Sequence, residues 1–108
     1  MTKRIVITPR ASQDLDENFA YIDQNNLDAA LRFFDAARQT FARLAQMSGM
    51  GRLYPVQNPR LEGLRRLPVR GFENYLIFYL SFDDCIEVVR ILHAARDLEE
   101  VFSGDEAD

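Results

Sequence analysis

The chain has 108 residues, of which 47% are hydrophobic and 28% charged, and its formal net charge is -4. This length suits one compact domain of roughly 100 to 150 residues and excludes two separate hydrophobic cores. With one Cys and one His, the sequence excludes an intramolecular disulfide, and we expect no metal site and no cofactor.

The first half of the chain predicts a short strand followed by a helix. Ile5–Ile7 has the composition of a strand, Thr8 is a suitable N-cap, and Pro9 suits the first helical position because its missing N–H costs nothing there. Apolar residues then recur at helical spacing, which places them on one face. These residues are Ala11, Leu15, Phe19 and Ile22.

A second helix follows after a short connection. Asn25 and Asn26 are expected to end the first helix, and the second begins near Asp28, so the two helices should form an antiparallel hairpin. Asp14 and Glu17 lie off the apolar stripe of the first helix, and we expect both to be solvated. The stripe of the second helix contains Ala30, Phe34, Ala37, Phe41 and Leu44.

Three strands are predicted in the second half: Leu64–Val69, Tyr75–Phe82 and Ile86–Leu92. Pro68 cannot donate to a sheet ladder, which suggests an edge or the end of a strand. The turns between the strands are expected at Gly71 and Asn74, and at Asp83 and Asp84. The fold class is therefore α+β, with an N-terminal strand, an antiparallel two-helix hairpin, and a three-stranded antiparallel meander that completes one sheet.

The negative charge belongs to the C-terminal end. Residues 97–108 contain six acids and no base, so the rest of the chain is slightly positive. We expect one domain over residues 1–102 that ends in a short helix, and a disordered acidic tail over 103–108. The tail is either a solubilising end or a regulatory segment that covers an arginine patch. The apolar residues expected to dock from the terminal helix are Leu98, Val101 and Phe102.

The sequence gives no sign of membrane insertion or export. No apolar run approaches the roughly 18 residues of a spanning helix, and the N-terminus lacks the apolar core of a signal peptide. We therefore expect a soluble cytoplasmic protein without a membrane partner.

Arginine dominates the basic residues, since Lys3 is the only lysine among 13 basic side chains. Guanidinium groups bind anions in a planar, bidentate way, so a cluster on the sheet could hold one anionic partner. The alternative is that these arginines are solvated and reflect composition only. The five arginines in or beside the predicted strands are Arg65, Arg66, Arg70, Arg90 and Arg96.

His93 is the one side chain with an intrinsic pKa suited to acid or base catalysis near neutral pH. Side chains alternate along a strand, so Arg90 and Leu92 should share one face while Ile91 and His93 share the other. This alternation weakens a direct pairing of Arg90 with His93. Both a structural histidine at the strand end and a catalytic one remain open.

Four segments carry a family resemblance: YI at Tyr21–Ile22, AALRFF at Ala29–Phe34, LEGLRRLPVRGFENYLIFY at Leu61–Tyr79, and IEVVRILHAARD at Ile86–Asp97. In their order and spacing they resemble the ParE branch of the RelE/ParE toxin superfamily. The resemblance implies the toxin of a type II toxin-antitoxin pair that inhibits DNA gyrase and so blocks replication. It further implies a ParD-like antitoxin that assembles with the toxin as a hetero-oligomer, while this chain alone binds no specific DNA.

The RelE branch offers a different function, because its members cut messenger RNA on the ribosome with basic residues and a Tyr, His or Glu. Arg66, Arg90 and His93 fall at comparable places here, and they are the catalytic residues of this alternative. The chain has no lysine after Lys3 and carries HAARD where a catalytic tyrosine would be expected. We therefore favour the inhibitor, in which no residue is catalytic and the five arginines contact the target or the antitoxin. A third alternative is an inactive module that only binds an antitoxin.

Overall fold

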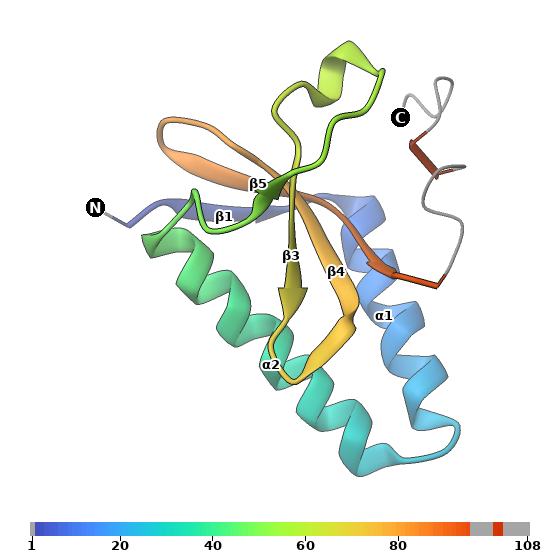
Figure 1. Cartoon of the computed structure of the whole chain (residues 1–108). Coiled ribbons are helices and arrows are strands. Elements are labelled where there is room, and N and C mark those ends of the chain that lie inside the picture. The colour runs from blue at the N-terminus through green and yellow to red at the C-terminus, as the bar shows by residue number, and fades with distance from the viewer. Residues whose placement is uncertain (1, 96–100, 103–108) are drawn as a thin grey trace.

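The computed structural model describes residues 2–95 and 101–102, and it has the predicted α+β architecture, with two helices on one face of a five-stranded sheet (Figure 1). The predicted order of strand, two helices and three strands is confirmed, with a two-residue strand and a short 3-10 helix added between the helices and the meander. The elements are β1 (Arg4–Ile7), α1 (Pro9–Asp23), α2 (Leu27–Gln46), β2 (Arg52–Leu53), η1 (Pro59–Leu61), β3 (Arg65–Val69), β4 (Phe72–Ser81) and β5 (Cys85–His93).

The sheet has the strand order β1-β5-β4-β3-β2, so the N-terminal strand pairs with the last strand of the meander. β1 runs parallel to β5, with Ile5 opposite Ile86, while the other neighbours are antiparallel. β2 pairs only with Arg65 and Arg66 of β3, which leaves the β3 edge open at Pro68. The missing N–H of this proline is therefore tolerated, as expected for an edge.

Both helices begin at side-chain caps. The Thr8 hydroxyl accepts a hydrogen bond from the Ala11 amide at 3.1 Å, which confirms the N-cap of α1. α1 ends at Asp23, just before Asn25 and Asn26 as expected, and Asn26 also caps α2 by accepting from the Ala29 amide at 3.0 Å. The three-residue connection between the helices gives the expected antiparallel hairpin.

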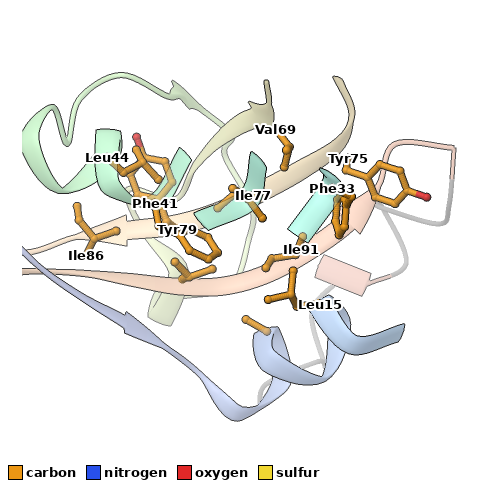
Figure 2. Close-up of a cluster of buried hydrophobic side chains, with 13 residues drawn as sticks. Leu15, Phe33, Phe41, Leu44, Val69, Tyr75, Ile77, Tyr79, Ile86 and Ile91 are labelled. Atoms are coloured by element: carbon orange, nitrogen blue, oxygen red, sulfur yellow. The ribbon is translucent and has the colours of Figure 1, made fainter. Parts of the chain in front are cut away.

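β4 is buried on both faces, which explains its continuous apolar sequence. Tyr75, Ile77 and Tyr79 alternate with their neighbours and face the helices, as Figure 2 shows. The intervening residues face away and pack under residues 54–61 and residues 101–102. We call this second side the open sheet face, because neither helix of the hairpin covers it. Strands that are covered on both sides lose the polar alternation of a half-exposed strand.

The helix stripes were predicted in part. Ala11 and Leu15 of α1 are buried, as are four of the five predicted positions of α2. Phe34 is only half-buried, whereas its neighbour Phe33 is fully buried and packs its ring against Tyr75 with the centroids 4.9 Å apart. The α2 stripe is therefore wider than the predicted single row.

Two expectations for the second half need correction or restriction. The turn between β3 and β4 is formed by Arg70 and Gly71, and the φ of +87° at Gly71 suits glycine. Asn74, which was expected in this turn, lies inside β4.

Val101 and Phe102 dock on the open sheet face as predicted. The rest of the expected terminal helix, including Leu98, and the tail at 103–108 lie outside the described residues. In the described part of the chain, no helix has the length and apolarity needed to cross a membrane.

Candidate functional site

The two adjacent arginines of β3 point to opposite faces of the sheet. Arg65 lies opposite Tyr79 in the register, and its Nη1 donates to the Gly51 carbonyl at 2.6 Å. Arg66 lies opposite Phe78 on the open sheet face, with its guanidinium 5.6 Å from the centroid of the Tyr54 ring, a cation–π distance. One guanidinium is thus bound to the backbone, and the other rests on an aromatic ring.

The remaining predicted arginines do not join them in one cluster. Arg70 is exposed in the turn after β3, about 13 Å along the strand from Arg66 at roughly 3.3 Å per residue. Arg96 lies outside the described residues. Arg90 is on β5, two strands away from β3. The structure therefore distributes the described arginines of the predicted patch over both faces and one end of the sheet.

Arg90 is held by a carboxylate from the helix layer. Its Nε and Nη2 donate to the two carboxylate oxygens of Asp14 at 2.7 and 3.1 Å, and the Ile91 amide donates to the same carboxylate at 3.0 Å. The side chains of Asp14 and Arg90 are only 5% and 13% exposed. The expectation that Asp14 is solvated was wrong, because this side chain is the buried partner of Arg90.

The position of Asp14 follows from the end of β1. β1 pairs with β5 only as far as Val88, so the next β5 backbone groups need other partners. The Thr8 hydroxyl donates to the Val89 carbonyl at 3.2 Å, and the Asn18 amide donates to the Ile91 carbonyl at 3.0 Å. Side chains of α1 and of its N-cap therefore replace the missing strand along this edge.

A bulge in β5 sets the direction of Arg90. The register shifts between Phe78 and Tyr79 of β4, which lie opposite Arg90 and Val88, so Val89 is the extra residue. The bulge places Arg90 on the open sheet face, in one row with Phe78 and Arg66. From there its guanidinium reaches the free edge of β5 and meets Asp14.

His93 lies on the other side of the sheet. It pairs with Tyr75, which faces the helices, and the two rings meet edge to face with centroids 4.8 Å apart. Its Nδ1 accepts a hydrogen bond from the Ala95 amide at 3.0 Å. The predicted alternation is confirmed, and the three residues of the ribonuclease alternative do not converge on one face.

A buried phenol fixes the loop that leads into β2. The Tyr79 hydroxyl donates to the Ser48 carbonyl at 2.9 Å and accepts from the Gly51 amide at 2.8 Å. Burial raises the pKa of the Tyr79 phenol above its usual 10.0, although the Gly51 hydrogen bond and the charge of Arg65 oppose the shift. The hydroxyl is therefore a structural tether, protonated at neutral pH.

The structure collects a different set of arginines in a hollow of about 610 Å³ on the open sheet face. We call it the arginine groove. Arg10 comes from the first turn of α1, Arg60 from η1, and Arg90 from β5, with Glu87 beside them. The apolar part of its lining consists of Pro9, Leu61, Leu80, Val89, Val101 and Phe102.

The sequence could have indicated the residues that hold β5 and Arg90, but not the other arginines of this groove. Asp14 and Asn18 lie three residues after Ala11 and Leu15, so they border the apolar stripe and could have been expected near the core. Arg10 and Arg60 carry no such local signal. They reach Arg90 only through the parallel pairing of β1 with β5 and through the path of residues 54–64.

The groove has the chemistry of a binding site more clearly than that of a catalytic site. Breaking an RNA phosphodiester bond requires one group that removes a proton and another that supplies one. Among the described residues that line the groove, Glu87 is the one carboxylate, and there is no histidine. The arginines can neutralise an anion, but a second proton-transfer group is missing from this lining.

A comparison with models of known protein families identifies the family of this chain. The family model described as ParE toxin of type II toxin-antitoxin system, parDE, matches residues 5–98. The chain belongs to this family. Among curated proteins there is no match to the chain.

A solved structure supports the ParE fold. The structure described as the chromosomal ParDE TA system from P. aeruginosa aligns with a TM-score of 0.66 and 20% sequence identity. The alignment covers 85% of this chain and 96% of the other. The expected fold of a ParE-like toxin is thereby confirmed, with the helix hairpin and the meander in the predicted order.

Proposed function

We propose that this ParE-family toxin acts by binding and inhibiting DNA gyrase, without catalytic turnover, and that a ParD-like antitoxin neutralises it in a hetero-oligomer. The toxin would block replication in the cytoplasm. The family match supports the toxin-antitoxin pairing, and the geometry of the sheet supports an inhibitor over a nuclease.

One observation carries this preference. Arg90 lies on the open sheet face and is neutralised by Asp14 at the free edge of β5, whereas His93 lies on the other face, toward the helices. A nuclease of the RelE type would need its cationic and proton-transfer groups around one scissile phosphate. A protein inhibitor needs only a stable contact surface, which this sheet and hairpin can supply.

The surface also has features of a binding protein. Tyr21, Leu27 and Leu31, near the closed end of the helix hairpin, are each more than half exposed. Exposed apolar side chains of this size near one another favour a protein contact. Arg66 and Arg70, which no described carboxylate or carbonyl binds, are the predicted arginines best placed to contact gyrase or the antitoxin.

Growth arrest tests the toxin assignment in the cell. Expression of the chain alone should stop growth, and co-expression of the antitoxin encoded beside it should restore growth. In the arrested host cells, DNA replication should stall while messenger RNA remains intact. Harmless expression of folded protein in a host with sensitive gyrase would argue against toxin activity.

The kinetics of the toxin-antitoxin complex test the nature of their interface. Charge reversal at an exposed arginine such as Arg70 should mainly slow association, whereas truncation of an apolar anchor such as Leu31 should speed dissociation. A flexible antitoxin segment that folds on the toxin would bury apolar surface. Separation of the purified pair by high salt alone would contradict such an interface.

A further inference from the structure

A row of side chains crosses the open sheet face from β2 to β5. Arg52 lies opposite Arg66 in the strand register, and Arg66 lies opposite Phe78. Phe78 in turn lies opposite Arg90. Side chains directly opposite each other on neighbouring strands point to the same face. The row therefore carries three arginines, and two of them are direct neighbours at its β2 end.

The two neighbours, Arg52 and Arg66, lack a counter-ion within the described part of the chain. Arg52 is exposed and makes no hydrogen bond, ion pair or ring contact there, and the guanidinium of Arg66 rests on the Tyr54 ring. The Asp14 carboxylate is bound to Arg90 at the far end of the row, three strand spacings or roughly 14 Å away. Like charges directly opposite each other destabilise a sheet, so an anion bound between these arginines would remove a repulsion.

The fold holds β2 in place against this repulsion. Gly51, which precedes β2, has both backbone groups bound: its amide donates to the Tyr79 hydroxyl at 2.8 Å, and its carbonyl accepts from Arg65 at 2.6 Å. The amide of Tyr54, which follows β2, donates to the carbonyl of the residue before β3 at 2.8 Å. These hydrogen bonds on both sides of the two-residue strand keep the Arg52 backbone in register.

An aromatic cluster orients the second guanidinium. The Tyr54 ring packs on Phe78 and Phe102, with centroid distances of 5.2 and 5.8 Å. Arg66 lies over this ring at 5.6 Å. An aromatic ring positions a guanidinium without bringing a formal negative charge. Both arginines are therefore presented as cations by backbone and rings that other contacts fix.

Two adjacent guanidinium groups match the chemistry of a phosphate. Each guanidinium offers forked N–H donors that pair with two phosphate oxygens. Arg52 lies exposed on the outermost strand of the sheet, where a small ligand would not be enclosed. A backbone phosphate of a long nucleic acid needs no such enclosure, so it suits this position.

We infer that Arg52 and Arg66 bind a backbone phosphate of the DNA that gyrase holds, so that the toxin contacts gyrase and its DNA together. The inference rests on the proposed function, because it takes gyrase as the target. A phosphate contact reads no base sequence. The net charge of -4 opposes strong binding of the toxin to DNA alone, so the contact forms only where gyrase brings the DNA to the toxin.

Two parallel binding measurements separate a DNA contact from a protein contact. The Kd of the toxin is measured for gyrase alone and for gyrase bound to a DNA duplex, and the original toxin should bind the second more tightly. Arg52→Gln and Arg66→Gln should each raise the Kd for gyrase with DNA about tenfold and leave the Kd for gyrase alone unchanged. Arg38→Gln, exposed on α2, is the matched control and should change neither Kd.

Salt dependence and stability give two readouts that a structural arginine would not. For gyrase with DNA, the slope of log Kd against log salt concentration should fall by about one in the double variant, because one phosphate contact is lost. In urea unfolding, the midpoint of Arg52→Gln should equal or exceed that of the original toxin, because a like-charge repulsion is removed. A clearly lower midpoint would contradict the like-charge pair on which the inference is based.

The outcomes separate this contact from the proposed function. If the folded variants bind gyrase with DNA as tightly as the original toxin does, the inference is wrong. If they lose equal affinity for gyrase alone, the pair contacts the gyrase protein, and the inference fails while the proposed function stands. If the original toxin binds gyrase neither with nor without DNA, both fail. Weaker binding of the variants to ribosome-bound messenger RNA would then assign the phosphate to RNA.

Discussion

Loss of Arg90 should destabilise the protein before it affects any target. The Asp14 carboxylate is 5% exposed and accepts three hydrogen bonds, two from Arg90 and one from the Ile91 amide. Removing one partner of a buried pair leaves an uncompensated charge and typically costs about 3 to 5 kcal/mol. A small domain has roughly 5 to 15 kcal/mol of total stability, so Arg90→Ala should be close to unfolding.

Asp14→Ala should cost at least as much, because it also leaves the Ile91 amide without its acceptor. Urea unfolding of both single variants and the double variant measures the coupling. The double variant should be more stable than the sum of the single losses predicts, by about 1 to 3 kcal/mol.

An exposed ion pair on α2 provides the control. The side chains of Arg32 and Asp28 are 62% and 80% exposed, so Arg32→Ala should cost no more than about 0.5 kcal/mol. If Arg90→Ala loses less than about 1 kcal/mol and still abolishes toxicity, then Arg90 acts on the target and its structural role is refuted.

Three further results are expected. Tyr79→Phe should cost about 1 to 3 kcal/mol in urea unfolding, since the buried Gly51 amide and the part-buried Ser48 carbonyl lose their partner. Because the folded pKa of Tyr79 lies above the unfolded value of 10.0, its share of stability is present below pH 10 and is lost as pH rises further. Tyr79→Phe should flatten that alkaline loss, and exposed Tyr21→Phe should not. Gly51→Ala should cost about 1 to 3 kcal/mol, because its Cβ would lie 2.7 Å from a backbone oxygen and from the Tyr79 hydroxyl, whereas Gly49→Ala has open space and should be neutral. His93→Ala should keep most growth inhibition, and a folded but inactive variant would indicate catalysis.

The elements were predictable because their signals are local. The Thr8 cap with Pro9 sets the start of α1, and the helix stripes and apolar strand runs follow from periods of 3.6 and 2. The continuous run of β4 is also a local signal, since a strand covered on both faces has no need of polar residues. These signals determine which segments form helices and strands.

The candidate site was less predictable because it depends on contacts between distant segments. The bulge at Val89 shifts the register of β5, and nothing in the neighbouring residues indicates it. The burial of Asp14 follows from the end of β1, which leaves the β5 edge in need of side-chain partners. β2 could not be predicted either, because it consists of only two residues, both exposed, and two residues show no periodic pattern.

The most direct test of a non-catalytic gyrase inhibitor uses one preparation of purified toxin in two parallel reactions. Gyrase supercoiling is measured over a range of toxin concentrations, and cleavage of ribosome-bound messenger RNA is measured at the same concentrations. We expect inhibition of supercoiling, reversed by the antitoxin, with intact messenger RNA. Cleaved messenger RNA together with unaffected supercoiling would contradict the proposal and favour the ribonuclease.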